Sequence, residues 1–181
     1  MDTKNYFKIG ITGHRDLLPS QYDENITILK GHILKLKREY PEKQLLILTP
    51  LAEGADRLIA KVALDLNIPY DVIMPMPKEL YLKDFSTKSQ KEFDNYLKQA
   101  RNIITIPLYE GNTFELIAKN SIFRNFQYRE MGRTIVEMAD EMIVMSDGKK
   151  SDKIGGTYDI ANYAKVYGTI LYQIRCDRSC V

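Results

Sequence analysis

The sequence has few of the residues and segments that most directly reveal a protein's location or chemistry. Only two cysteines occur among its 181 residues, Cys176 and Cys180. Neither is accompanied by the further cysteine or histidine ligands that a zinc site requires. We therefore expect reduced thiols on a loose carboxy-terminal tail, residues 175–181, and no metal site.

Long hydrophobic runs and a strong charge imbalance are also absent. No apolar run approaches the roughly 18 residues that read as a membrane-spanning helix. The first residues contain no apolar signal region. These absences favour a cytoplasmic protein with no membrane partner. The formal net charge is only +2, so we expect nucleic acid not to be the main partner.

Familiar catalytic motifs are missing as well. The sequence contains no HExxH pair, no Walker A lysine followed by serine or threonine, and no GxSxG elbow. These absences argue against zinc proteases, P-loop ATPases and α/β-hydrolases.

Apolar segments alternate with segments of helical periodicity along most of the chain. Strands are predicted at 6–12, 44–49, 70–75, 100–106, 141–145 and 169–174. Helices are predicted at about 21–39, 56–66, 89–99, 120–138 and 157–166, with a turn-rich segment at 78–88. Because the strands are too apolar to be half exposed, we expect an α/β fold, a Rossmann-like three-layer sandwich with a mostly parallel sheet. Residues 1–181 are expected to form one nucleotide-binding domain.

Three polar loops that contain glycine follow three of the predicted strands. They are Thr12-Gly13-His14-Arg15, Glu53-Gly54-Ala55-Asp56 and Gly155-Gly156-Thr157. The carboxyl ends of parallel strands meet at one edge of a sheet, where ligands of such folds bind. We therefore expect the three loops to form one pocket of nucleotide size.

The glycine pair Gly155-Gly156 is the strongest candidate for an anion site. A glycine pair at a helix start is expected to leave backbone N–H groups free, and the helix dipole favours negative charge there. Phosphate would then bind beside Thr157, and a plain turn is the alternative. The lysine-rich stretch 149–153 either closes over the phosphate or forms a solvated charged run.

The loop after the first predicted strand supplies further candidates. Gly13 permits close approach of the backbone to a ligand. His14 and Arg15 add a switchable donor and a permanent cation. The alternative is an ordinary solvent-exposed turn.

Carboxylates and one helix complete the candidate site. Glu53 is suited to accept hydrogen bonds from ribose hydroxyls or to act as a general acid or base. Asp56 is suited to stabilise a helix start and, with Glu53 and the intervening Gly54, to contact the ribose hydroxyls or the reacting centre of a ligand. Tyr128 and Arg133, on the helix predicted at 120–138, are expected to face the pocket.

These loops give the chain a resemblance to the SLOG superfamily over about residues 6–174. The residues that carry it are Thr12-Gly13-His14-Arg15-Asp16, Leu51-Ala52-Glu53-Gly54-Ala55-Asp56-Arg57, Met74-Pro75-Met76-Pro77, Tyr81, Asp84-Phe85, Tyr128, Gly132-Arg133 and Gly155-Gly156-Thr157. The superfamily comprises Rossmann-like domains similar to the cytokinin-activating LOG phosphoribohydrolases, the lysine-decarboxylase-like proteins and the DprA/Smf fold.

The resemblance implies a nucleotide or a nucleotide-derived ligand. One branch of the superfamily cleaves the N-glycosidic bond of nucleoside 5′-monophosphates, and another senses signals such as ADP-ribose in bacterial defence systems. The hydrolases carry a Pro-Gly-Gly-x-Gly-Thr loop followed by a catalytic glutamate. This chain has Ile154-Gly155-Gly156-Thr157-Tyr158-Asp159 instead, with Asp159 near the position of that glutamate.

Three hypotheses about function follow. The leading one is a homodimeric sensor or carrier of a nucleoside monophosphate, NAD or ADP-ribose, with no cofactor other than that ligand. The second is a LOG-type N-glycosidase in which Glu53 or Asp159 acts at the ribosyl centre. The third is an oligomeric module that binds a protein partner.

Overall fold

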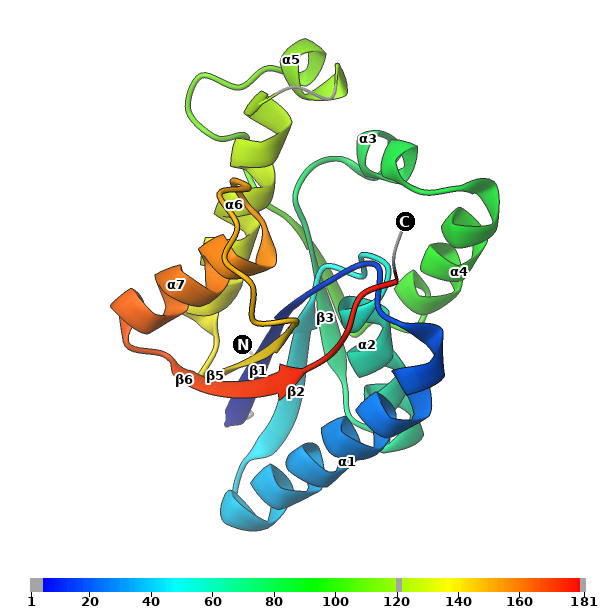
Figure 1. Ribbon diagram of the computed structural model, residues 1–181, viewed down its shortest axis with the longest axis vertical. Coiled ribbons are helices and arrows are strands. Elements are labelled where there is room, and N and C mark those ends of the chain that lie inside the picture. Colours follow the sequence, from blue (N-terminus) through cyan, green and yellow to red (C-terminus); the bar gives the residue numbers. More distant parts are fainter. Residues whose placement is uncertain (1–4, 120–121, 180–181) are drawn as a thin grey trace.

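The structure is a computed structural model that describes residues 5–119 and 122–179. Its centre is a parallel sheet in the order β4-β3-β2-β1-β5-β6. The strands are β1 (Tyr6–Gly13), β2 (Gln44–Thr49), β3 (Tyr70–Met74), β4 (Asn102–Thr105), β5 (Glu141–Ser146) and β6 (Ile170–Arg175). Figure 1 shows this sheet between two layers of helices, which confirms the expected Rossmann-like α/β sandwich.

The helices lie largely where periodicity predicts them. The α-helices are α1 (Tyr22–Glu39), α2 (Ala55–Asp65), α3 (Lys78–Tyr81), α4 (Thr87–Leu97), α5 (Phe114–Ala118), α6 (Ile122–Met138) and α7 (Thr157–Tyr167). Two 3₁₀ turns, η1 (Pro19–Gln21) and η2 (Leu82–Asp84), precede α1 and α4. Residues 120 and 121, which begin the helix predicted at 120–138, lie outside the described residues.

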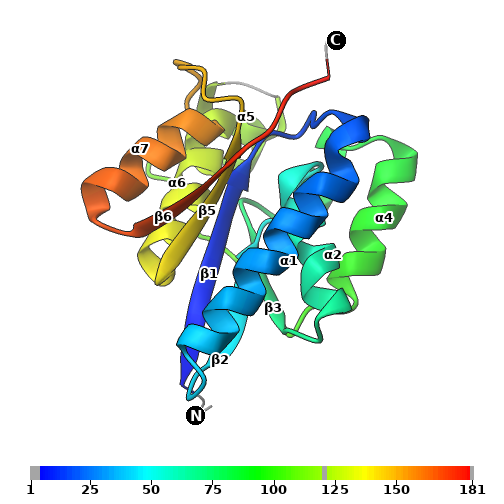
Figure 2. The ribbon, with the colours of Figure 1, turned by 60° about the horizontal axis from the view of Figure 1, so that its bottom comes forward.

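Alternate residues of the strands face two separate hydrophobic cores. On β2, Leu45 and Ile47 pack into the core that α1 and α2 cover. Leu46 and Leu48 face the opposite core, beneath α6 and α7. The two-residue repeat of a strand places successive side chains on opposite faces. Strands buried on both faces therefore read as unbroken apolar runs, and Figure 2 shows the face covered by α1 and α2.

Side-chain caps explain where two helices begin. Ser86 accepts a hydrogen bond from Ser89 N–H at 3.3 Å, and α4 accordingly begins at Thr87, earlier than predicted. Thr113 accepts one from Leu116 N–H at 3.3 Å and begins α5, which periodicity did not predict. Such caps satisfy N–H groups that have no partner within the helix.

The carboxy-terminal segment is not loose, which corrects the expectation for residues 175–179. Cys176 is buried, and its N–H donates to the Ser146 carbonyl oxygen at 3.1 Å. Arg178 forms an antiparallel bridge with Leu17, and its Nη2 lies 2.8 Å from Asp16 Oδ2. These backbone bonds extend the path of β6 across the segment that follows β1. Burial raises the pKa of the Cys176 thiol to about 11, and Cys180 lies outside the described residues.

Among the helices of the described residues, none combines the length and apolarity needed to cross a membrane. The cytoplasmic location and the single-domain organisation stay predictions.

Candidate functional site

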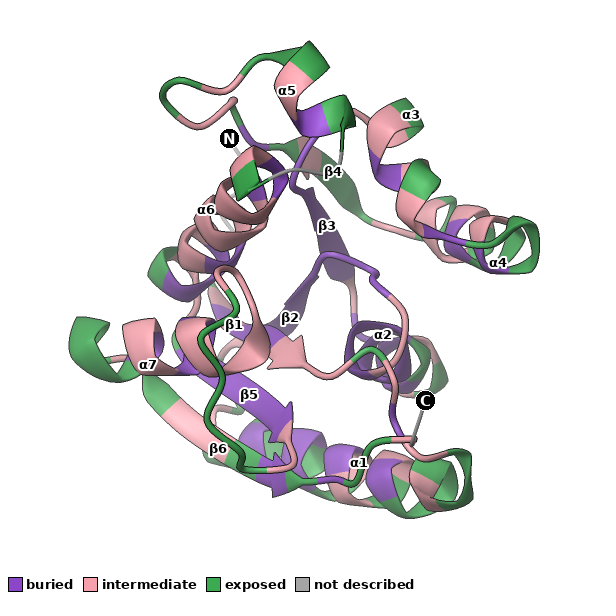
Figure 3. Ribbon diagram, turned by 45° about the horizontal axis from the view of Figure 1, so that its top comes forward, coloured by how far each residue is buried: buried purple, intermediate pink, exposed green. Residues whose placement is uncertain are grey.

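A cleft opens where the strand order reverses. From β1, the strands β2, β3 and β4 extend to one side and β5 and β6 to the other. Ligands of open parallel sheets bind at such a switch point, outside the carboxyl ends of the strands. The cleft there has a volume of about 750 Å³. In Figure 3 the segment that joins β5 to α7, residues 147–156, runs beside α6 and α7, opposite α2 and α3.

The loop after β1 and the loop before α2 are packed tightly together. Ala55 N–H donates to the His14 carbonyl oxygen at 3.2 Å. Gly54 has a φ of +76°, and a Cβ there would lie 2.3 Å from that same oxygen. A Cβ on Gly13 would lie 2.3 Å from the Ala55 Cβ. Close packing therefore explains why both positions are glycine. Gly13 lines the cleft, whereas Gly54 lies behind the cleft wall.

Arg15 extends from the end of β1 towards aromatic rings at the cleft. Its guanidinium carbon lies 5.5 Å from the ring centroid of Tyr128 and 5.8 Å from that of Phe85. Cation–π attraction of this kind holds a guanidinium in place. The Tyr128 hydroxyl donates to the Asp84 carboxylate, which fixes the ring in turn. Arg15 and Tyr128, both predicted site residues, thus meet at the cleft.

Arg124, on α6, is buried behind this aromatic cluster. It is 2% exposed, and its Nη2 lies 2.9 Å from Asp84 Oδ2. It also donates to the carbonyl oxygens of Ile117 and Leu80, at 2.7 and 2.8 Å. Because its donors are directed to α3, η2 and α5, Arg124 joins those segments to α6 rather than serving a ligand.

Asp56, in the first turn of α2, is a buried carboxyl that lines the cleft. It is 6% exposed, and its Oδ2 accepts a hydrogen bond from Ala52 N–H at 3.1 Å. Burial raises the pKa of Asp56 to about 7, against the opposing effects of Arg15, the Ala52 N–H and Arg57. At neutral pH, Asp56 is therefore present in both the protonated and the ionised form.

His14 and Asp147 join the ends of β1 and β5. His14 Nε2 and Asp147 Oδ1 are 3.1 Å apart, and Lys149 N–H donates to the same carboxylate oxygen at 3.0 Å. Burial works against ionisation of this carboxyl, but these two hydrogen bonds and electrostatic attraction to His14 and Lys149 outweigh it and lower the pKa of Asp147. The first residues of the 147–156 segment are thus attached to β1.

The glycine pair does not offer free N–H groups, which corrects the expectation from the sequence. Gly155 N–H donates to Asp159 Oδ2 at 2.8 Å, and Gly156 N–H donates to the Lys153 carbonyl oxygen at 3.0 Å. Gly155 has a φ of +71°, and a Cβ there would lie 2.7 Å from the Asn125 carbonyl oxygen of α6. The pair therefore closes the loop on itself and against α6.

The cleft keeps two other means of attracting an anion. The N–H groups of the first turn of α7, from Thr157 onward, have no carbonyl partner within their own helix. Lys149, Lys150 and Lys153 are exposed and line the same cleft. No carboxylate in residues 5–119 or 122–179 lies within ion-pair distance of these three ammonium groups.

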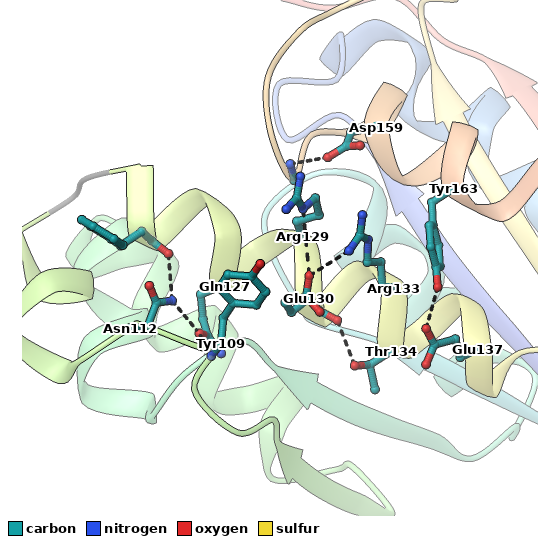
Figure 4. A network of polar contacts seen from close by, with 12 residues as sticks. Tyr109, Asn112, Gln127, Arg129, Glu130, Arg133, Thr134, Glu137, Asp159 and Tyr163 are labelled. Atoms are coloured by element: carbon teal, nitrogen blue, oxygen red, sulfur yellow. Dashed lines mark hydrogen bonds and ion pairs between the residues drawn. The ribbon is translucent and has the colours of Figure 1, made fainter. Parts of the chain in front are cut away.

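Besides Gly54, three predicted site residues lie outside the cleft wall. Arg133 donates to Glu130 at 3.1 Å, and its guanidinium carbon lies 4.8 Å from the Tyr163 ring centroid. Figure 4 shows the contact between Arg133 and Glu130. Asp159 is engaged by the Gly155 N–H, and Glu53 is half-buried beside the α2 start. The two carboxylates given a catalytic role from the sequence, Glu53 and Asp159, therefore do not converge on the cleft.

Sequence reasoning missed two cations of the cleft wall. Arg178 comes from the carboxy-terminal segment that was expected to be loose. Lys165 is four residues after Ala161, another wall residue of α7, so helical spacing could have indicated it. No group of three or more potential metal ligands gathers anywhere in the described part of the chain.

Known proteins resemble this chain in structure but not detectably in sequence. No protein-family model and no curated protein matches it. DNA processing protein A (DprA) from Streptococcus pneumoniae superposes with a TM-score of 0.60 and 18% identity, over 93% of this chain and 50% of that one. DprA from Helicobacter pylori gives 0.57 and 18%, over 92% and 64%. The chain thus spans between half and two thirds of the length of these proteins.

The comparison overturns two predictions about the ligand. We expected a small nucleotide-derived ligand, with N-glycosidase activity or a protein partner as alternatives, and we excluded nucleic acid as the main partner. The H. pylori protein, whose fold matches 92% of this chain, is described by its mode of binding single-stranded DNA. The exclusion rested on the net charge of +2, an average over the whole surface that hides a local cluster of lysines.

The same likeness supports the coarser part of the resemblance. It shows a Rossmann-like fold but gives no support to the closer likeness to LOG enzymes or ADP-ribose sensors. The chain has the Rossmann-like fold found in the DprA proteins, with a cleft lined by exposed lysines at its switch point.

Proposed function

We propose that this protein binds single-stranded nucleic acid in the cleft between the ends of β1 and β5. The observation that carries the proposal is the set of exposed ammonium groups of Lys149, Lys150 and Lys153 on one rim of that cleft. Cations without a partner in the protein attract phosphates and release the counterions of a nucleic acid on binding. The ssDNA binding described for a protein of the same fold agrees with this reading.

The carboxylates of the cleft do not cancel this attraction. Asp16 pairs with Arg178 at 2.8 Å, and Asp84 pairs with Arg124 at 2.9 Å. Asp147 is engaged by the hydrogen bonds to the end of β1. These carboxylates already have donors within the protein. The stretch 149–153 holds three lysines and one carboxylate, Asp152, and therefore keeps a net positive charge.

The cleft favours an unpaired strand over a duplex. Arg15 and Tyr128 present a guanidinium plane and an aromatic ring at the cleft. Unstacked bases bind to such surfaces, whereas the bases of a duplex are stacked on one another. A strand whose phosphates lie along residues 149–153 would place its bases towards these rings.

The test is fluorescence anisotropy with a labelled single strand of mixed sequence and with its duplex, over a range of salt concentrations. Replacing Lys149, Lys150 and Lys153 with alanine should reduce the slope of log affinity against log salt by about 2, because each phosphate of a single strand contributes about 0.7. The matched control replaces Lys37 on α1, Lys91 on α4 and Lys98 directly after α4, which are exposed and do not line the cleft. This control should keep the slope of the unaltered protein.

Two results would contradict the proposal. One is the absence of binding to the single strand at low salt. The other is an equal loss of affinity in both triple variants, because general attraction by surface charge would then explain the binding.

A further inference from the structure

We propose that Asp56 recognises a base of the bound strand and selects bases that carry an exocyclic amino group, so that cytosine is preferred to thymine. The inference rests on the proposed function and adds sequence preference to it. Phosphate contacts position a nucleic acid, whereas contacts to base edges specify its sequence.

The two sides of the cleft differ in a way that orients the strand. The lysines line the rim formed by residues 147–156. The opposite wall, formed by Pro50, Ala52, Asp56, Tyr81 and Asp84, contributes apolar surface, one ring and two carboxyls, with Arg15 as a nearby cation. Phosphates directed to the lysines leave the bases facing this wall. Asp84 is bonded to Arg124 and Tyr128, so Asp56 is the carboxyl of this wall that keeps an oxygen for a base.

One oxygen of Asp56 has a structural partner and the other does not. Oδ2 accepts from Ala52 N–H at 3.1 Å, which accounts for a role in ordering the start of α2. No donor from the described residues bonds to Oδ1, although the residue is only 6% exposed. Oδ1 is accessible at the surface of the cleft, since it is not one of the fully buried polar atoms that lack a partner. A donor on a ligand in the cleft can therefore bond to it in place of water.

The chemistry of the free oxygen determines which base it accepts. A carboxylate accepts a hydrogen bond from the cytosine N4 amino group. Thymine presents a carbonyl oxygen at the corresponding position, and two acceptors placed together repel each other. The protonated carboxylic acid has an O–H donor as well as an acceptor oxygen, so it accommodates either base. The base preference should therefore depend on the protonation state of Asp56.

The groups around Asp56 place this change near neutral pH. Arg15, from the loop after β1, and Arg57, on α2 itself, favour the ionised form, and Tyr81 of α3 adds a phenol beside it. Burial outweighs the two arginines and brings the pKa of Asp56 to about 7. The preference for cytosine should therefore increase as the pH rises through about 7.

The experiment compares two labelled strands of equal length, one of thymine alone and one that alternates cytosine and thymine, at pH 8 and pH 6 and equal ionic strength. The unaltered protein should bind the cytosine-containing strand about tenfold more tightly at pH 8. The ratio of the two affinities should approach one at pH 6. Asp56→Asn keeps an oxygen for Ala52 N–H but presents an amide donor in place of Oδ1, so its ratio should be close to one at both pH values.

A matched control separates base recognition from a general change of charge. Asp65→Asn removes the same charge at the far end of α2, where Asp65 pairs with Lys30 and Lys61. It should keep both the preference and its dependence on pH. Should Asp56→Asn fail to fold, the unaltered protein at the two pH values decides the question without any substitution.

The outcomes distinguish this inference from the proposed function. Equal affinity of the unaltered protein for both strands at pH 8 would overturn base recognition by Asp56 and leave strand binding in place. A cytosine preference that persists in Asp56→Asn would also overturn it. Failure to bind either strand at low salt would overturn both proposals.

Discussion

The two sides of the cleft hold cations in opposite circumstances. Arg124 is 2% exposed and bonded to a carboxylate and two carbonyl oxygens. Lys149, Lys150 and Lys153 are exposed and, among the residues described, have no carboxylate partner. The guanidinium of Arg124 is bonded within the protein, whereas the ammonium groups of the lysines are available to bind a ligand. The number of cations in a sequence thus says little about how many can bind an anion.

Asp56 combines features of both sides. It is buried, as Arg124 is, but one of its oxygens has no bond to the described residues. The comparison therefore predicts three kinds of substitution. One kind lowers the free energy of unfolding, one raises it, and one leaves it unchanged.

The largest effect is expected for Arg124→Met. This change leaves the Asp84 carboxylate and the carbonyl oxygens of Leu80 and Ile117 without their donor, so the free energy of unfolding should fall by about 3–5 kcal/mol. Urea denaturation measures it, with the exposed Arg38→Met as control, expected to change stability by about 0.5 kcal/mol or less. A decrease of less than ~1 kcal/mol in the free energy of unfolding would contradict the contrast between the bonded Arg124 and the exposed lysines.

Asp56→Asn should stabilise the protein at alkaline pH. As pH rises past 3.8, Asp56 ionises in the unfolded chain but stays protonated in the folded one up to about pH 7, so stability falls over that interval. This loss of stability is complete above about pH 7, and it does not occur with asparagine because that side chain does not ionise. We expect a gain of about 2–4 kcal/mol at pH 8 that vanishes near pH 4. Urea denaturation at both pH values measures this gain, and the same difference at both would contradict the prediction.

Gly155→Ala should be more harmful than Gly148→Ala. Both glycines have positive φ, +71° and +74°, so each substitution incurs the conformational cost of about 1–2 kcal/mol. Only at Gly155 would the new Cβ also meet the α6 backbone, 2.7 Å from the Asn125 carbonyl oxygen. The extra overpacking should cost about 1 kcal/mol more. Equal melting temperatures of the two variants would show that the loop is not held against α6 as described.

The smallest effect on stability is expected for the triple alanine variant at Lys149, Lys150 and Lys153. Since these side chains have no ion pair to lose, the free energy of unfolding should change by no more than about 0.5 kcal/mol. The same variant should show the reduced salt slope of strand binding. A substantial loss of stability would mean that the lysines have partners within the protein after all.

Particular residues show which parts of the candidate site could be predicted from the sequence. The loops after β1, β2 and β5 were expected to meet, and Gly13, His14, Arg15, Asp56, Tyr128, Gly155, Gly156 and Thr157 do line one cleft. Arg133 was misplaced because α6 packs on α7 and the residue faces the Tyr163 ring. Arg178 was missed because an antiparallel bridge to Leu17, far away in the sequence, brings it to the cleft.

The sequence alone determined the parallel sheet, the positions of its strands and the edge at which a site forms. Those features depend on local periodicity and on the apolar character of each segment, which neighbouring residues specify. Only the tertiary structure decided which charged and polar groups remain available. Whether an N–H group, a carboxylate or an ammonium is already bonded depends on residues distant in the chain, such as Arg124 with Asp84. The Gly155 N–H could not be recognised as occupied until the fold of the loop directed Asp159 towards it.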